Sequence, residues 1–295
     1  LAANPERTSW TAEEDRGNLR PVWYRPIEPF INRKVQVIAA NGLLYLSTAR
    51  GLYALHADDG DIAWVYPTEL PLGHSPTVVG DTLYVGGLDR KIHAISANPD
   101  VSTLPLDQDT GYRLNNKLFW TFEAGSDGAE LGAGFETNPL VVGGVLYAGN
   151  RNGILYAVYA NDHPDASKRG HLLWKFKTDG AIRFSAAYKD GVVFFASTDA
   201  RAYAVDANTG SLVWKSAKLP GAGFHSYWPV VYQGWAVFAG SHNYMVDHNL
   251  RLPDDFGYTT QELRDVYTKQ GVPAGELIGP QGQEPGDWAA GTLTI

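Results

Sequence analysis

Charged and aromatic side chains recur at equivalent positions along this chain, two to four residues ahead of short strand-like segments. Taking Pro76, Pro139, Ala186 and Pro229 as equivalent positions of four units aligns most of these side chains. With one arginine at the start of the first unit, the set comprises Arg33, His74, Glu136, Arg183, His225 and Tyr227. Such a ring could bind a small anion or a loop of a partner. The alternative is an ordinary solvated lining, and the sequence leaves both open.

Other kinds of site find little support in the residue types. The chain contains no cysteine, which excludes disulfides, thiolate catalysis and thiolate metal sites within these 295 residues. No Gly-x-Ser-x-Gly motif marks a nucleophile, and no two of the eight histidines have the spacing that brings metal ligands onto one helix face. The sequence therefore predicts no catalytic, cofactor-binding or metal-binding residue.

The elements that must position the ring are repeated along the chain. Five units begin with an aliphatic-aromatic pair whose aromatic residues are Tyr45, Tyr84, Tyr147, Phe194 and Phe238. In the first four units a second phrase with a central alanine follows, and then a tryptophan: Trp64, Trp120, Trp174 or Trp214. Short segments rich in β-branched and aromatic residues, separated by Gly, Asp and Asn, indicate four strands per unit. A period of roughly 40 to 50 residues with four strands predicts an all-β fold, a β-propeller of four-stranded blades.

One interval between units is longer than the others. The second runs from residue 84 to residue 147, and its surplus lies in the polar, turn-rich stretch 97–117. We expect this stretch to be a loop inserted between two strands, so its deletion should leave the melting temperature nearly unchanged.

The end of each unit resembles a known family. Residues 54–64 and 204–214 look like the repeat aliphatic-Asp-Ala-x-Thr-Gly-x-x-x-Trp of the pyrroloquinoline-quinone-like (PQQ-like) β-propellers. The resemblance implies that Trp64, Trp120, Trp174 and Trp214 are wedges between adjacent blades. It also implies a ring of seven or eight blades, of which about five are visible here. The remaining blades would come from the same polypeptide or from another chain.

The family includes both quinoprotein dehydrogenases and a periplasmic scaffold lipoprotein of outer-membrane assembly. The dehydrogenases hold PQQ over a tryptophan floor, with a calcium ion bound by carboxylate and amide ligands. Those ligands find no matching positions in this chain, so no cofactor is predicted, and PQQ with calcium is the alternative. We expect a non-enzymatic, exported scaffold that binds protein partners. The alternatives are a periplasmic PQQ- and calcium-dependent quinoprotein dehydrogenase, or part of one, and a carbohydrate-binding module of a secreted protein.

The repeat divides the chain into three parts. Residues 1–34 form a lead-in arm, or alternatively a ring-closing strand; residues 35–250 form the blades; residues 251–295 hold a loop and helix insertion and the start of a further blade. Within the last part, residues 259–270 are predicted to be one helix. Glycan binding would require exposed aromatic residues on one loop face, for which the candidates are Trp228, Trp235, Tyr258 and Trp288. Trp228 and Trp235 lie in strand-like sequence, which favours a place in the core for these two.

Charge and hydropathy limit the partners. The 32 acidic residues exceed the 24 basic ones, for a formal net charge of −8, which argues against a nucleic-acid backbone. The sequence contains no run of 18 apolar residues, so it predicts no membrane-spanning helix. With the family resemblance, this composition favours an extracellular, cell-surface or periplasmic location.

Overall fold

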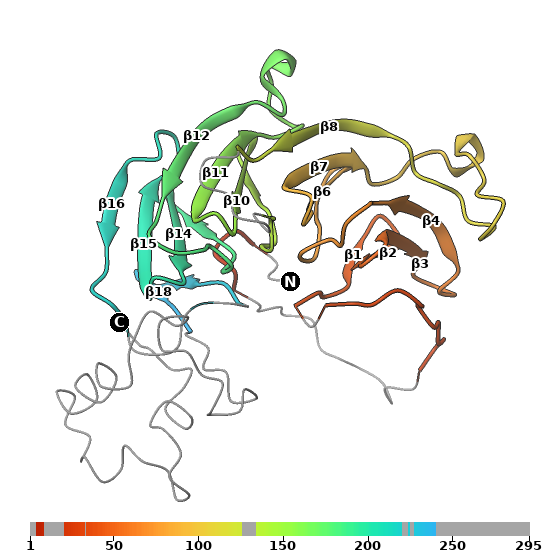
Figure 1. Ribbon diagram of the computed structural model, residues 1–295, viewed down its shortest axis with the longest axis horizontal. Coiled ribbons are helices and arrows are strands. Elements are labelled where there is room, and N and C mark those ends of the chain that lie inside the picture. The colour runs from red at the N-terminus through yellow and green to blue at the C-terminus, as the bar shows by residue number, and fades with distance from the viewer. Residues whose placement is uncertain are drawn as a thin grey trace, which may run out of the picture.

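The computed structural model describes residues 4–8, 21–32, 34–125, 134–219, 224 and 227–239, and within them the chain is all-β (Figure 1). Four four-stranded antiparallel sheets follow one another, each formed by consecutive strands, and a two-stranded sheet comes after them. The predicted propeller architecture of four-stranded blades is therefore confirmed. The predicted helix 259–270 and the rest of 251–295 lie outside the described residues.

The strands have the following bounds. Sheet 1 contains β1 (Ile38–Ala40), β2 (Leu43–Thr48), β3 (Gly51–His56) and β4 (Ile62–Pro67). Sheet 2 contains β5 (Thr77–Val79), β6 (Thr82–Gly86), β7 (Lys91–Ser96) and β8 (Leu118–Glu123). Sheet 3 contains β9 (Leu140–Val142), β10 (Val145–Gly149), β11 (Ile154–Tyr159) and β12 (Leu172–Lys177). Sheet 4 contains β13 (Ala187–Lys189), β14 (Val192–Ser197), β15 (Arg201–Asp206) and β16 (Leu212–Lys215). The two-stranded sheet pairs β17 (Val230–Tyr232) with β18 (Trp235–Val237), and short 3-10 turns are η1 (Val101–Thr103) and η2 (Ala166–Lys168).

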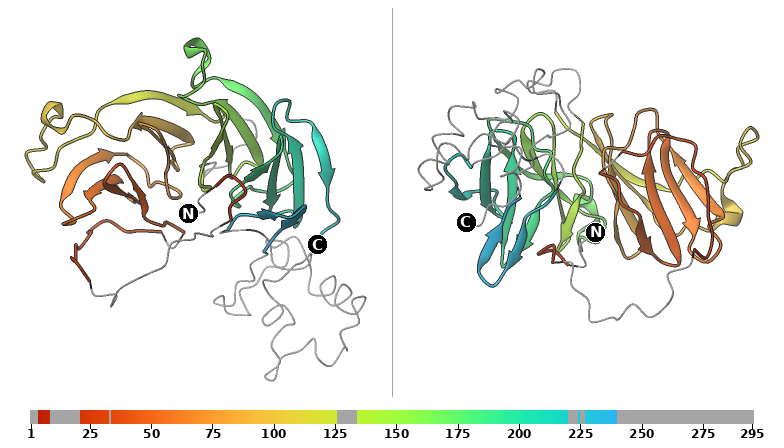
Figure 2. Two further views of the ribbon diagram at one scale, coloured as in Figure 1. Left: turned by 180° about the vertical axis from the view of Figure 1, so that it is seen from behind. Right: turned by 90° about the horizontal axis from the view of Figure 1, so that it is seen from below.

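The sheets are arranged face to face around an arc (Figures 1 and 2). In each four-stranded sheet the first strand lies at the inner edge of the arc, and the fourth strands β8, β12 and β16 run along its outside (Figure 1). Sheets 2 and 3 therefore lie between two neighbouring sheets, which requires apolar residues on both sides of their central strands (Figure 1). β11 illustrates this, because its first five residues are all buried.

The first hairpin of each unit is closed by residues with positive φ. Asp190 and Gly191 have φ of 48° and 83°, and Asn41 and Gly42 have φ of 54° and 73°. Two consecutive left-handed residues make the tight turn that matches strand twist, and Asn, Asp and Gly adopt them at low cost. These turns fix the register of the strands that follow.

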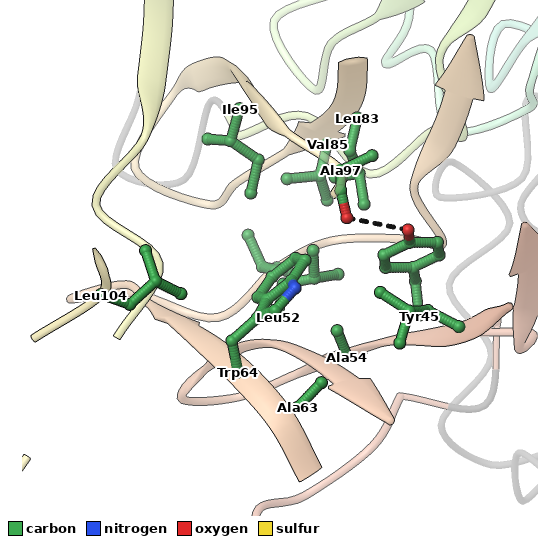
Figure 3. Close-up of a cluster of buried hydrophobic side chains, with 12 residues drawn as sticks. Tyr45, Leu52, Ala54, Ala63, Trp64, Leu83, Val85, Ile95, Ala97 and Leu104 are labelled. Carbon is green, nitrogen blue, oxygen red and sulfur yellow. Dashed lines mark hydrogen bonds between the residues drawn. The ribbon is translucent and has the colours of Figure 1, made fainter. Parts of the chain in front are cut away.

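The space between sheets 1 and 2 is filled by a core around Trp64 (Figure 3). Tyr45 of β2 donates its hydroxyl hydrogen bond to the carbonyl of Ala97, which follows the third strand of the next sheet, at 2.9 Å (Figure 3). Tyr147 makes the same bond to the carbonyl of Ala207, at 3.1 Å. The tyrosine of one blade is thus tied to the backbone of the next.

The predicted wedge tryptophans differ in burial. Trp64 is fully buried and Trp174 is 8% exposed, whereas Trp120 is only partly buried. Trp214 is 37% exposed, which is more than a wedge between two blades should be. Trp174 is covered by the turn after β15 of the following sheet, and no described strand beyond β18 supplies such a turn for Trp214.

The stretch 97–117 is more than a surface loop. Leu104 is 2% exposed and belongs to the core cluster that contains Trp64 (Figure 3). Backbone hydrogen bonds join Val65 of β4 to Arg113 at 2.8 Å and to Asn115 at 2.8 Å. The insertion therefore covers the outer edge of sheet 1, and these contacts argue against the expectation that its deletion would leave the melting temperature unchanged.

Candidate functional site

The first strands of the sheets converge on a cavity of about 590 Å³ on the inside of the arc. Its lining comes from residues 37–39, 76–79 and 138–141 and from Asn4, Pro5 and Arg7. The N-terminal residues are held there by backbone hydrogen bonds, from Tyr188 to the carbonyl of Pro5 and from Val231 to that of Glu6. Residues 4–8 thus lie inside the arc rather than outside the blades.

Arg7 joins three sheets at this inner edge. Its side chain is 5% exposed and donates to the carbonyl of Ala186 at 2.9 Å and to the Asn138 side-chain oxygen at 2.6 Å. The Asn138 amide in turn donates to the carbonyl of Ser75 at 3.0 Å and to the hydroxyl of Thr77 at 2.9 Å. Burial lowers the pKa of Arg7 to about 10. The arginine remains charged at neutral pH and acts as a brace.

A cluster of charged side chains surrounds Glu136, just ahead of β9. Arg183 Nε lies 3.4 Å from one carboxylate oxygen and Arg151 Nη1 lies 3.7 Å from the other. Lys34 is a third cation near Glu136, close enough for the charges of the cluster to act on its pKa. Burial lowers the pKa of Lys34, Glu136 opposes this shift, and Arg183 and Arg151 add to it. Glu136 is 18% exposed and the two arginines are about a third exposed. Three cations around one carboxylate leave an excess of positive charge that solvent and solutes can reach.

The predicted ring is only partly assembled in this cluster. Glu136 and Arg183 come together, whereas Tyr227 is 54% exposed and its carbonyl accepts a hydrogen bond from Ser185. Arg33 and His225 lie outside the described residues.

His74 is buried rather than presented to solvent. Its side chain is 1% exposed, and its Nδ1 accepts a hydrogen bond from the Ser75 amide at 2.8 Å. Burial, with smaller contributions from Lys34 and Arg7, lowers the pKa of His74 to about 3. The imidazole is therefore neutral at physiological pH, with its proton on Nε2, and adds no charge to the cluster.

Several residues of this inner face were not singled out from the sequence. Asn138 directly precedes Pro139 of the aligned set, so its position was available as a signal. Arg151 follows β10 in the turn Asn150 to Gly153, which leads to the same end of the sheet. Arg7 gave no signal, because it lies in the lead-in arm, far in sequence from Ala186 and Asn138, to which its side chain donates.

Comparison of the sequence with protein-family models shows the family of this chain. A family model described as outer membrane protein assembly factor BamB matches residues 3–163 and 165–250, most of the chain. The chain belongs to the PQQ-like β-propeller family. The predicted family is thereby confirmed.

Among curated relatives of this PQQ-like chain are enzymes much longer than the matched segments. The dehydrogenase subunit of the quinone alcohol dehydrogenase of Gluconacetobacter polyoxogenes is 34% identical over 128 residues, 39% of this chain and 16% of that protein. Tetrathionate hydrolase of Acidithiobacillus ferrooxidans is 28% identical over 164 residues, 48% of this chain and 28% of that protein. The chain thus matches less than a third of either relative's length.

Solved structures agree on the propeller fold. BamB from Moraxella catarrhalis aligns with a TM-score of 0.56 at 18% identity, over 73% of this chain and 60% of that one. Quinohemoprotein alcohol dehydrogenase ADHIIG from Pseudomonas putida HK5 aligns with a TM-score of 0.50 at 18% identity, over 74% of this chain and 38% of that one. At this identity the similarity shows the fold alone.

The described inner face does not suit a calcium ion. Calcium binds six to eight oxygen ligands, usually including several carboxylates. In the described part of the chain, no group of three or more His, Cys, Asp or Glu residues could hold a metal. Glu136, the carboxylate of the cluster, is already paired with Arg151 and Arg183, and the surrounding positive charge would repel a divalent cation. We therefore derive no chemistry through PQQ or calcium from these residues.

Proposed function

We propose that this PQQ-like β-propeller is a non-enzymatic scaffold whose inner face binds an acidic segment of a partner protein. The observation that carries the proposal is the cationic cluster of Lys34, Arg151 and Arg183 around Glu136. Arginine guanidinium groups bind carboxylates through charge-assisted, often bidentate hydrogen bonds, and Glu136 does not neutralise three cations.

The surrounding structure supports a binding role. The sheets hold the cluster on strand ends and tight turns, so a partner would meet preorganised side chains and lose little affinity to their ordering. Within the described segments no helix is long and apolar enough to cross a membrane. We propose an exported location, periplasmic, cell-surface or extracellular, which both kinds of relative in the family make reasonable.

A labelled octaglutamate peptide provides a direct test by fluorescence anisotropy at low and high salt. We expect binding that weakens with salt and falls roughly tenfold or more in the double variant Arg151→Gln/Arg183→Gln. Arg90→Gln is the matched control, because Arg90 also pairs with a glutamate, Glu123 of the outer strand β8, at 2.8 Å. Equal loss in both variants, or no binding at all, would contradict the proposal.

The alternative function is part of a PQQ- and calcium-dependent dehydrogenase, which the family match leaves open. Native mass spectrometry of protein purified from its source, without added cofactor, separates the two functions. Protein without a bound quinone, together with peptide binding, is the expected result. A bound mass equal to PQQ plus calcium, with alcohol-dependent dye reduction, would overturn the scaffold.

A further inference from the structure

Arg7 lines the cavity on the inside of the arc, and one of its hydrogen-bond donors is unpaired. Its Nε and Nη1 donate to the carbonyl of Ala186 and to the side-chain oxygen of Asn138. Its Nη2 is buried and has no hydrogen-bond partner among the described residues. Buried donors nearly always have a partner, because an unpaired one loses its hydration without compensation. The Nη2 amine therefore still lacks an acceptor.

The charge of Arg7 is also unpaired within the part of the chain that the structure describes. The carboxylate next to it in sequence, Glu6, pairs with Lys189 at 3.1 Å instead. Burial is the one cause that lowers the pKa of Arg7, and no described carboxylate opposes it. A buried cation without a counter-ion is unfavourable, and a carboxylate is the acceptor that guanidinium groups bind best. The missing acceptor of Nη2 is therefore expected to be an anion.

The cavity around Arg7 has the size and the lining of a site for a small organic molecule. Its volume of about 590 Å³ lies within the range of about 300–1,000 Å³ that such sites occupy. Its other polar side chains, those of Asn4, Thr77 and Asn138, are hydrogen-bonded within the protein. Proline and aliphatic residues form the rest of the described lining. Val37, directly before β1, is 53% exposed, so solvent reaches the cavity beside it.

The number of free donors limits the charge of the ligand. Nη2 carries two N–H groups, which one carboxylate can accept. A phosphate monoester has three acceptor oxygens and a charge of about −1.5 to −2, which one amine does not match. The pKa of His74 is lowered mainly by burial and further by the charges of Lys34 and Arg7, so both cations act on this part of the inner face. A single carboxylate on an apolar body fits these conditions.

We propose that this cavity binds a small organic acid, with its carboxylate on Nη2 of Arg7 and its apolar body against β1, β5 and β9. Arg7 belongs to residues 4–8, which precede the repeat, so the repeated units alone do not build this site. The proposal does not depend on the acidic partner proposed above, because that partner binds the cluster of Lys34, Arg151 and Arg183.

Two fluorescent probes test whether the carboxylate is recognised. Dansylglycine carries a carboxylate and an apolar ring system, and dansylamide carries the same ring system without the carboxylate. On the intact polypeptide, calorimetry and dansyl fluorescence should show one dansylglycine per chain and binding of dansylamide at least about tenfold weaker. Equal affinity for the two probes, or no saturable binding of dansylglycine, would overturn the proposal.

A cavity-filling variant locates the site without removing the brace. Val37→Trp places a large side chain at the exposed side of the cavity and should weaken dansylglycine binding about tenfold or more. Val213→Trp is the matched control, because Val213 is also 53% exposed but lies on the outer strand β16, and its affinity should be unchanged. Unchanged binding in Val37→Trp, or equal losses in both variants, would place the probe elsewhere and overturn the assignment.

Substitution of the arginine itself tests its role. Arg7→Gln should bind dansylglycine and dansylamide with nearly equal affinity, since the charged donor is gone, and retention of the preference for dansylglycine would contradict the role of Arg7. Circular dichroism verifies the fold of this variant, because the substitution also removes the brace between sheets. Should it fail to fold, the comparison of the two probes and the Val37→Trp variant decide the proposal.

Competition separates this site from the cationic cluster around Glu136. The double variant Arg151→Gln/Arg183→Gln should keep the affinity of the parent protein for dansylglycine, and octaglutamate should not displace the probe. Loss of the probe in that variant, together with displacement by octaglutamate, would assign the carboxylate to the cluster and overturn the cavity site. Binding of dansylglycine without any binding of octaglutamate would support the cavity site and contradict only the function proposed for the cluster.

Discussion

Replacing Gly210 by alanine should destabilise the protein more than the same change at Gly191. Both glycines have positive φ, 71° and 83°, so both variants incur the cost of about 1–2 kcal/mol that a Cβ adds to a left-handed residue. The Cβ at Gly191 meets nothing within 4 Å, whereas at Gly210 it lies 2.6 Å from the Trp174 ring. Gly191→Ala therefore isolates the backbone cost.

The additional cost at Gly210 follows from the packing of Trp174. The indole is 8% exposed and bonded to the carbonyl of Ala207, so it cannot move away without opening the contact between sheets 3 and 4. Overpacking of this kind costs about 1–3 kcal/mol, and loss of the indole hydrogen bond adds about 1 kcal/mol. We expect Gly210→Ala to lower the free energy of unfolding by about 2–4 kcal/mol more than Gly191→Ala does.

Guanidinium chloride unfolding, followed by tryptophan fluorescence, measures both variants against the parent protein. In a Trp174→Ala background the two alanine substitutions should cost the same, because the clash is gone. Equal costs in the parent background would refute the reasoning, since they would show that the glycine serves only the turn.

The remaining predictions concern burial, the insertion and pH. Trp64→Ala should cost about 3–5 kcal/mol, as for fully buried aromatics, and Trp214→Ala clearly less because Trp214 is 37% exposed; denaturant midpoints compare them, and equal losses would contradict the burial argument. Deleting 97–117 and closing the gap with a two-residue turn should lower the melting temperature by several degrees, since Leu104 leaves the core and β4 loses its hydrogen bonds; an unchanged calorimetric transition would restore the simple-loop interpretation. The pKa of His74 is lowered to about 3 in the folded protein, so below pH 6.5 this imidazole binds a proton in the unfolded chain but not in the folded protein. The free energy of unfolding should therefore fall by about 3–5 kcal/mol between pH 6.5 and 3. His74→Gln should flatten this slope in unfolding measurements at several pH values, and an unaltered slope would place the titration elsewhere.

Much of the site lay beyond sequence analysis, because its contacts join residues distant in the chain. Glu136 and Arg183 could be placed together by aligning the units, since strands in equivalent positions end at the same edge. His74 was aligned equally well, yet its side chain is buried, and alignment does not indicate which way a side chain faces. Arg7 contacts residues 131 and 179 positions away, and no local pattern predicts such contacts.

The sequence by itself determined the blades. Alternating apolar residues, the Gly, Asn and Asp turns and the repeated tryptophan each act within one unit, so local physical chemistry defines four antiparallel strands. Gly60 and Trp64 stand four residues apart and appear as one local motif. The tertiary structure instead sets Gly60 against Trp23, places the insertion on Trp64 and brings three cations around Glu136. These contacts were decided only when the sheets packed, because face-to-face packing pairs residues of neighbouring units whose spacing no single repeat encodes.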